Sequence, residues 1–221
     1  PGDWPEAWQS ADRTAAGAVA STIDGLPFPT EPGIAAAVGE SLPDGALLYV
    51  SSSMPIRDLA LTFAPTDRDV RIAANRGANG IDGLLSSALG AAAAGERPVV
   101  ALCGDLSALH DLSALAAAAR LAIPISIVVV DNDGGGIFHF LPQREHPAHF
   151  ERHFGTPHGL DLVAAAGSLG VAAREMAGRA ELESFVGEVP GEPRVAVVRT
   201  DREANVAVHR QIAAAVEGAL A

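Results

Sequence analysis

The stretch PISIVVVDNDGGGIF, residues 124–138, decides the fold class of this chain. Its first half is a run of mostly β-branched residues without polar alternation, which is typical of a strand buried on both faces of a parallel sheet. Its second half places Asn132 at the end of that strand, followed by three glycines that let a backbone approach a ligand closely. A flexible loop is the alternative interpretation of the glycines. The stretch indicates a parallel sheet and directs the search for a site to its strand ends.

Strand and helix patterns alternate on both sides of this stretch. We expect strands at 46–50, 69–74, 97–103, 124–130 and 194–200. We expect a helix after the N-cap Thr30, and further helices at 54–63, 83–94, 107–121, 160–170, 179–189 and 202–220. The alternation predicts an α/β fold, doubly wound, with a mostly parallel sheet of about six strands and helices on both faces.

The first 29 residues differ from the rest of the chain. Trp4 and Trp8 begin a run with helical spacing, which is followed by the linker sequence LPFP. One interpretation is a helix packed on the main domain. We favour the tail helix and linker of a preceding central domain, so that residues 30–221 form the ligand-binding domain. Since the chain begins with Pro1 rather than Met, we expect it to be the C-terminal part of a longer protein.

Charge and cysteine content exclude several classes of function. The 221 residues include 27 acids and 15 bases, for a formal charge of −12. This balance argues against electrostatic binding of nucleic acid or of an anionic membrane, so an anionic ligand needs a metal ion or a few arginines. The single cysteine, Cys103, excludes an intramolecular disulfide and a cysteine-based zinc site. We see no membrane span and no signal peptide, and expect a cytoplasmic protein.

Two strand ends carry the oxygen ligands that magnesium prefers. Asp105 follows one predicted strand and Asn132 follows the next along the chain, and parallel strands bring such ends to one edge of the sheet. Asp105, the Asn132 side-chain oxygen and the Gly134 carbonyl, with two diphosphate oxygens and a water, would complete an octahedral shell. Helix capping by Asp105 and Ser107 is the alternative interpretation.

The same loops carry a resemblance to a known family. Gly104-Asp105 with Asn132 resembles the thiamine-diphosphate motif, written GDG and, further along the chain, NN; Leu106 and Asp131 depart from it. Four segments together resemble the 2-succinyl-5-enolpyruvyl-6-hydroxy-3-cyclohexene-1-carboxylate synthases of menaquinone biosynthesis. They are SSSMPIRD (51–58), NRGANGIDG (75–83), GDLSALHD (104–111) and NDGGGIF (132–138). The resemblance covers residues 30–200.

The resemblance implies the cofactors thiamine diphosphate and Mg²⁺, and the thiamine-diphosphate-binding fold. It implies Asp105, Asn132 and Gly134 as metal ligands. It implies that the cofactor cavity is formed by Ser53, Asn79, Gly104, Asp105, Leu106, Ser107, Asn132, Gly134, Gly135, Gly136, Ile137, Phe138 and Leu141. Arg57 and Arg76 match residues that bind substrate carboxylates, and Ile81 matches the apolar residue that supports the bent cofactor. A surface ion pair with Asp58 is the alternative for Arg57.

For the full-length enzyme, the resemblance implies a transferase that decarboxylates 2-oxoglutarate and adds the four-carbon carbanion equivalent to isochorismate. Such enzymes take an activating glutamate from a second, pyrimidine-binding domain, usually of the partner in a homodimer or homotetramer. No glutamate of this chain can be assigned that role, so we expect the isolated chain to be inactive. Two alternatives stay open: a carboligase of the acetolactate synthase type, and a stand-alone phosphate-binding module. The absence of a G-x-x-x-x-G-K-[ST] motif argues against the latter.

Five of the seven histidines lie between His139 and His158. His146, His149 and His153 would share a helical face, which allows a zinc site as one interpretation. Because Pro147 interrupts the start of such a helix and no H-x-x-E-H pattern accompanies it, we favour a segment that covers the active site with solvent-exposed histidines.

Overall fold

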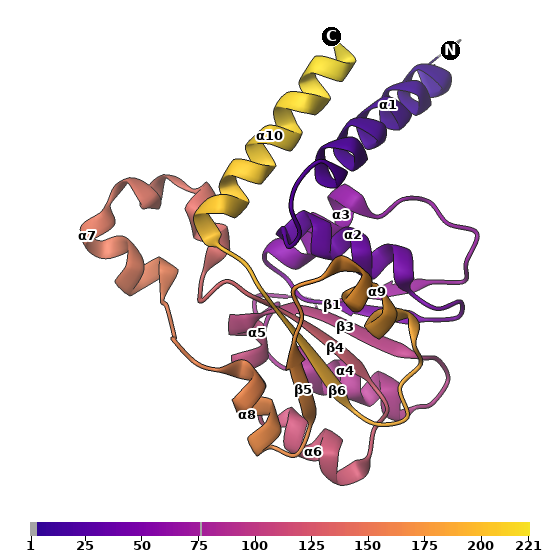
Figure 1. Cartoon of the computed structure of the whole chain (residues 1–221), viewed down its shortest axis with the longest axis vertical. Coiled ribbons are helices and arrows are strands. Elements are labelled where there is room, and N and C mark those ends of the chain that lie inside the picture. Colours follow the sequence, from indigo (N-terminus) through magenta and orange to yellow (C-terminus); the bar gives the residue numbers. More distant parts are fainter. Residues whose placement is uncertain (1–3, 76) are drawn as a thin grey trace.

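Six parallel strands form the centre of the fold in the computed structural model, which describes residues 4–75 and 77–221 (Figure 1). The strands are β1 (Leu47–Val50), β2 (Arg71–Ala73), β3 (Val99–Gly104), β4 (Ser126–Asp131), β5 (Ala172–Glu175) and β6 (Arg194–Arg199). Their order across the sheet is β2-β1-β3-β4-β6-β5, and each neighbouring pair is parallel. The predicted doubly wound α/β fold with about six strands is therefore confirmed.

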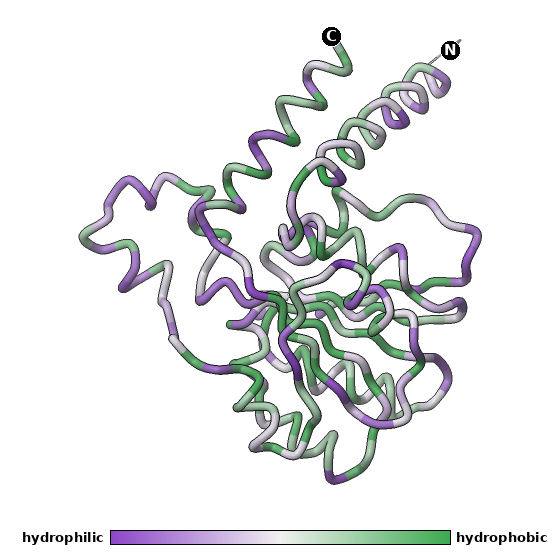
Figure 2. Tube along the Cα trace, viewed as in Figure 1, coloured by the Kyte–Doolittle hydropathy of each residue, from purple (hydrophilic) through white to green (hydrophobic). Residues whose placement is uncertain are grey.

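Helices cover both faces of this sheet (Figure 1). One face packs against α2 (Glu31–Ser41), α3 (Met54–Thr62) and α9 (Arg179–Gly187). The other packs against α4 (Leu84–Ala93), α5 (Asp105–His110), α6 (Ala114–Leu121) and α8 (Leu162–Ser168). Figure 2 shows the strands between these layers in the green of hydrophobic residues. The lack of polar alternation in β4 follows from this position: Ile127 and Val129 enter one core, and Val128 and Val130 the other.

The carboxyl ends of the central strands lie at one edge of the sheet. Gly104 of β3 pairs with Val130 of β4, so Asp105 and Asp131 follow at the same level. The chain runs outward from β1 to β2 and then returns across β1 to β3. This reversal between β1 and β3 is a topological switch point, where open α/β sheets bind their ligands.

One predicted helix differs from the observed structure, and one observed strand was not predicted. The single helix expected at 107–121 is divided into α5 and α6, because Asp111 leaves the helical conformation and its carboxylate accepts hydrogen bonds from the backbone and the hydroxyl of Ser86. The edge strand β5 was not expected, since AARE contains neither β-branched nor aromatic residues. Its pairing with β6 is a tertiary interaction that local sequence does not encode.

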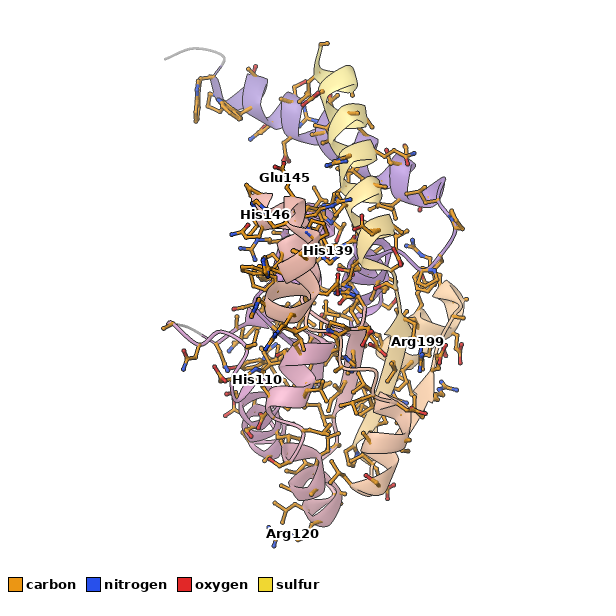
Figure 3. The ribbon with its side chains drawn as sticks, turned by 90° about the vertical axis from the view of Figure 1, so that its left-hand side faces the viewer. His110, Arg120, His139, Glu145, His146 and Arg199 are labelled. Carbon is orange, nitrogen blue, oxygen red and sulfur yellow. The ribbon has the colours of Figure 1, made fainter. Side chains whose placement is uncertain are left out.

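Four short helical segments separate β4 from α8. They are η1 (Gly136–Phe140), η2 (Pro142–Glu145), α7 (Pro147–Phe150) and η3 (Glu151–Gly155), and we call residues 136–155 the η1–η3 segment. It projects from the body and is largely hydrophilic (Figures 1 and 2). His146, His149 and His153 are exposed as expected. His139 is only 5% exposed and lies beside the start of α10, so the expectation of exposed histidines is wrong for it (Figure 3).

The terminal helices α1 (Trp4–Asp24) and α10 (Arg202–Leu220) lie side by side and extend from the body (Figure 1). Val19 and Ile23 of α1 pack against Ile212 of α10. Trp4 and Trp8 are 69% and 62% exposed at the far end of α1. The assignment of residues 1–29 to a preceding domain stays a prediction. Among the described helices, none combines the length and the apolar character that a membrane span requires.

Candidate active site

A cavity of about 760 Å³ lies at the switch point, over the carboxyl ends of β1, β3 and β4. Thirteen predicted site residues line it: Ser53, Arg57, Ile81, Gly104, Asp105, Leu106, Ser107, Asn132, Gly134, Gly135, Gly136, Ile137 and Phe138. Asn79 and Leu141 do not line it; both are exposed. Arg76 lies outside the described residues. The strand-end loops chosen from sequence thus meet at one cavity, and the roles of their residues stay predictions.

Asp105 is the first residue of α5 and is 2% exposed. Its Oδ1 accepts a hydrogen bond from the Leu106 N–H at 2.6 Å, and its Oδ2 accepts one from the Gly134 N–H at 2.7 Å. Burial raises the pKa of Asp105, and these two backbone hydrogen bonds oppose the rise. The second bond joins the loop after β3 directly to the loop after β4.

The capping alternative does not describe this helix start. No side chain caps α5 at Gly104. The Ser107 hydroxyl donates instead to the carbonyl of Ile81 at 3.2 Å, across the cavity rim. Asp105 and Ser107 therefore connect the loops around the cavity.

Asn132 presents an unused oxygen. Its Nδ2 donates to Glu31 Oε1 at 2.8 Å, whereas its Oδ1 is buried and has no hydrogen-bond partner. Buried polar atoms are nearly always paired, so an orphaned oxygen beside a buried carboxylate indicates a place for a cation. Carboxylate, amide and carbonyl oxygens of Asp105, Asn132 and Gly134 are ligands that Mg²⁺ prefers. The donor set fits this metal.

The glycines after Asn132 are required by close contacts between backbones. A Cβ on Gly134 would lie 2.0 Å from the Gly155 carbonyl oxygen, and one on Gly135 would lie 2.2 Å from that of Phe154. The Gly135 N–H donates to Gly155 O at 2.7 Å, and the Gly136 N–H donates to Gly134 O at 3.0 Å. These two N–H groups are thus already paired within the chain. Because these glycines have no side chain, the backbone can still lie close to a ligand in the cavity.

His158 joins this site, although sequence reasoning placed it in the exposed segment. Asp105, Asp131 and His158 form a group whose potential ligand atoms lie within 4.8 Å of one another. The Leu160 N–H donates to His158 Nδ1 at 3.0 Å, which places the proton of a neutral ring on Nε2. Nε2 lies 3.2 Å from Asp105 Oδ2, so His158 acts as a donor to that carboxylate. The exposed histidines of the η1–η3 segment form no such group in the described chain.

Arg57 and Ser53 also line the cavity. Arg57 is exposed on α3, and its Nη1 donates to Ser53 O at 2.6 Å. The expected alternative, an ion pair with Asp58, does not form: Asp58 is buried, and its Oδ1 lies 2.8 Å from His209 Nε2. Ser53 has a φ of +78°, a conformation that costs a residue with a Cβ about 1–3 kcal/mol and is typical of functional sites.

Part of the cavity wall is apolar. Ile81, Ile137 and Phe138 line it together with Leu102. The Phe138 ring, in η1, packs edge-on against Phe154, in η3, with centroids 5.4 Å apart, so the two ends of the η1–η3 segment meet at this wall. Such a wall excludes water from one side of a ligand.

Glu31 is a site residue that the sequence did not single out. It lies in the first turn of α2, is 3% exposed and lines the cavity. Burial raises the pKa of Glu31 to about 7, against the hydrogen bond from Asn132. An acid among the apolar residues of EPGIAAAV is the only signal in the sequence, and it does not identify a partner.

Comparison with known proteins identifies the family. The family model "Thiamine pyrophosphate enzyme, C-terminal TPP binding domain" matches residues 62–200. The chain belongs to this family. Thiamine pyrophosphate is another name for thiamine diphosphate, so the predicted cofactor is confirmed for this TPP-binding domain.

Similar sequences carry one name. The TPP-binding domain is 45% identical over 224 residues to 2-succinyl-5-enolpyruvyl-6-hydroxy-3-cyclohexene-1-carboxylate synthase of Myxococcus xanthus, covering 99% of this chain and 38% of that protein. It is 42% identical over 221 residues to the protein of the same name from Chloroflexus aurantiacus, covering 99% and 37%. The predicted resemblance is confirmed, and the chain spans less than two-fifths of the length of these relatives.

A solved structure supports the fold. The thiamine diphosphate-dependent 4-hydroxybenzoylformate decarboxylase of Rhodococcus jostii RHA1 aligns with a TM-score of 0.65 and 23% sequence identity. The match covers 80% of this chain and 34% of the decarboxylase. At this identity the likeness establishes the shared fold alone.

Proposed function

We propose that this TPP-binding domain is the diphosphate- and metal-binding part of a 2-succinyl-5-enolpyruvyl-6-hydroxy-3-cyclohexene-1-carboxylate synthase. The full-length enzyme decarboxylates 2-oxoglutarate and adds the four-carbon unit to isochorismate. The observation that carries the proposal is the 42–45% identity to synthases of that name along 99% of the chain. The cavity supports it, because oxygen donors, an exposed arginine and apolar side chains line the same space.

Different residues of the cavity would hold the metal and bind the substrate. Asp105, Asn132 Oδ1 and the Gly134 carbonyl would hold Mg²⁺, whose charge offsets that of a diphosphate. When bound, thiamine diphosphate supplies the electron sink for decarboxylation of a 2-oxo acid. Arg57 binds the remote carboxylate of the substrate, and we assign the same task to Arg76.

The apolar residues would exclude water from the reaction and orient the cofactor. Ile81 lines the cavity and would support the bent conformation of the cofactor, as in the family that the chain resembles. Ile137 and Phe138 exclude water beside the reacting carbon, and the contact of Phe138 with Phe154 holds this wall in place. A low-polarity pocket favours loss of a charged carboxylate, since the charge disperses as CO₂ leaves.

The activating glutamate comes from elsewhere in our proposal. Glu31 lines the cavity, but its Oε1 accepts hydrogen bonds from Asn132 at 2.8 Å and from Thr200 at 3.1 Å. These bonds direct Oε1 of Glu31 to Asn132 and Thr200 rather than to a cofactor ring. We therefore assign that glutamate to a pyrimidine-binding domain of the partner subunit, in a cytoplasmic homodimer or homotetramer.

The decisive experiment uses the full-length protein. With thiamine diphosphate and Mg²⁺, we expect 2-oxoglutarate and isochorismate to be consumed together, and pyruvate to be a poor replacement. Consumption of pyruvate alone would instead support a carboligase of the acetolactate synthase type. The isolated 221-residue chain should show no turnover. In calorimetry, binding of ATP or NAD in preference to thiamine diphosphate with Mg²⁺ would support a stand-alone phosphate-binding module.

A further inference from the structure

An asparagine that binds a metal must present the correct end of its amide. The oxygen and the NH₂ group of Asn132 occupy nearly equivalent positions, and a half-turn about Cβ–Cγ exchanges them. Mg²⁺ accepts only the oxygen, and an NH₂ group in its place would repel the cation. Some neighbour must therefore select the orientation of this amide.

Glu31 makes that selection in the structure. Its Oε1 accepts the hydrogen bond from Asn132 Nδ2 at 2.8 Å, and Asn132 Oδ1 is left buried without a partner. In its ionised form Glu31 only accepts hydrogen bonds, so the flipped amide would then place two oxygens in contact. Gly136 packs against the same amide, where a Cβ would lie 2.6 Å from Nδ2. The amide is thus confined and oriented by one acceptor.

Two further contacts involve Glu31 and the turn that carries it. Thr30 caps α2 through the Gly33 N–H at 3.1 Å, which fixes the turn that carries Glu31. The Thr200 hydroxyl donates to the same Oε1 at 3.1 Å from the loop that follows β6. A buried acid is costly unless it is hydrogen-bonded, and this acid is bonded by the metal-binding asparagine and by one threonine.

We propose that Glu31 is a positioning residue for the metal: it fixes the Asn132 amide with Oδ1 toward the cation. The proposal rests on the metal ligation assigned under Proposed function. Glu31 lies 101 positions from Asn132 in the chain and acts through it, without touching the metal. Partners of this kind, which orient a ligand from behind, typically contribute 10–100-fold to metal affinity.

A purely structural role is the competing explanation, because Glu31 also links α2 to the loop after β6. The two roles differ in what they change. A structural link contributes to the free energy of unfolding and leaves the metal affinity of the folded protein unaltered. A positioning role changes the metal affinity of protein that remains folded.

The test measures Mg²⁺ binding to the full-length protein by calorimetry at a saturating concentration of thiamine diphosphate. Glu31→Leu removes the acceptor, and we expect the half-saturating Mg²⁺ concentration to rise about 10-fold or more. Glu31→Gln retains an acceptor oxygen at the same reach, so a rise below about threefold is expected. Thr200→Val is the matched control: it removes the other hydrogen bond to Oε1 and should also change Mg²⁺ binding by less than about threefold.

The outcomes separate the explanations. Folded Glu31→Leu with unchanged Mg²⁺ binding, or a Thr200→Val effect as large as that of Glu31→Leu, overturns the positioning role. If Glu31→Leu does not fold, Glu31→Asp decides, since it withdraws the acceptor by one methylene and keeps the charge; unchanged Mg²⁺ binding there overturns the role as well. Wild-type protein that binds thiamine diphosphate without any divalent cation overturns the metal assignment itself.

Discussion

Gly134→Ala tests whether the contact between the metal-binding loop and the end of the η1–η3 segment holds the site together. Gly134 has a φ of +135°, outside the range that alanine adopts readily. The new Cβ would lie 2.0 Å from Gly155 O and 3.2 Å from Thr156 O, and both atoms belong to the backbone. To relieve this overlap, the loop that contains Gly134 must move away from the backbone at Gly155, which breaks the hydrogen bond from Gly135 N–H to Gly155 O.

The magnitude follows from two costs. Backbone strain at such a φ costs about 1–3 kcal/mol, and forced displacement of packed groups costs about 1–3 kcal/mol. A middle value for the sum is about 4 kcal/mol, which lowers the melting temperature of a domain of this size by roughly 8–16 °C. The Gly134 carbonyl moves with the loop, so Mg²⁺-dependent binding of thiamine diphosphate by the full-length protein should weaken as well.

Two other glycines separate these costs. Gly135→Ala meets Phe154 O at 2.2 Å, but its φ of −81° suits alanine, so only the displacement cost of about 2 kcal/mol applies. Gly159→Ala has a φ of +60° and no atom within 4 Å, so only strain of about 1 kcal/mol applies. Thermal unfolding followed by circular dichroism should rank the losses Gly134, Gly135, Gly159 in descending order. A Gly134→Ala protein that melts with or above Gly159→Ala would refute the reasoning.

Three further predictions concern other parts of the molecule. Arg57→Ala should lower kcat/KM for the 2-oxo acid by about 10–100-fold in the full-length enzyme, as loss of a charge-assisted contact does, while Arg120→Ala at the end of α6 should leave it unchanged. Burial lowers the pKa of His139 below its ordinary 6.5, so the charged ring is disfavoured in the folded state. The stability that this neutral ring contributes is present above pH 6.5 and is lost as the pH falls below that value. Below pH 6.5, amide hydrogen exchange in the η1–η3 segment, corrected for intrinsic rates, should therefore accelerate. His139→Phe should abolish this acceleration. Leu182→Ala, at a fully buried position of α9, should lower the free energy of unfolding by about 2–5 kcal/mol in urea titrations.

The parallel sheet was predictable because its signals are local. Runs such as that of β4 show burial on both faces by their composition, and the loops that follow β1, β3 and β4 carry their polar residues at fixed offsets from the strand ends. Since parallel strands align these ends, Asp105, Asn132 and Gly134 could be placed at one edge of the sheet without knowledge of any contact, and the family resemblance implied most of the other residues that line the cavity. Residues that directly follow a buried strand can therefore be predicted from the sequence to lie near the ligand.

Glu31 and His158 were not predictable in the same way, because their roles arise from contacts between distant segments. Glu31 meets Asn132 across 101 positions, and His158 meets Asp105 across 53. Neither residue stands at a strand end, and each has an ordinary local interpretation, as a first-turn acid and as a surface histidine. The failure to predict β5 has the same origin, since only its neighbour β6 makes AARE a strand.

The positions of the acidic side chains show where the net negative charge acts on a ligand. Glu31, Asp105, Asp131 and Asp133 gather around the edge of the sheet where we propose that an anionic diphosphate binds, in a chain of formal charge −12. Coulomb repulsion alone would oppose such a ligand, and a divalent cation reverses the sign of the local interaction. The affinities for cation and diphosphate must then be coupled, and linkage requires each to raise the other by the same factor. An acidic protein can therefore hold a diphosphate tightly when the metal is present and release both when either is withdrawn.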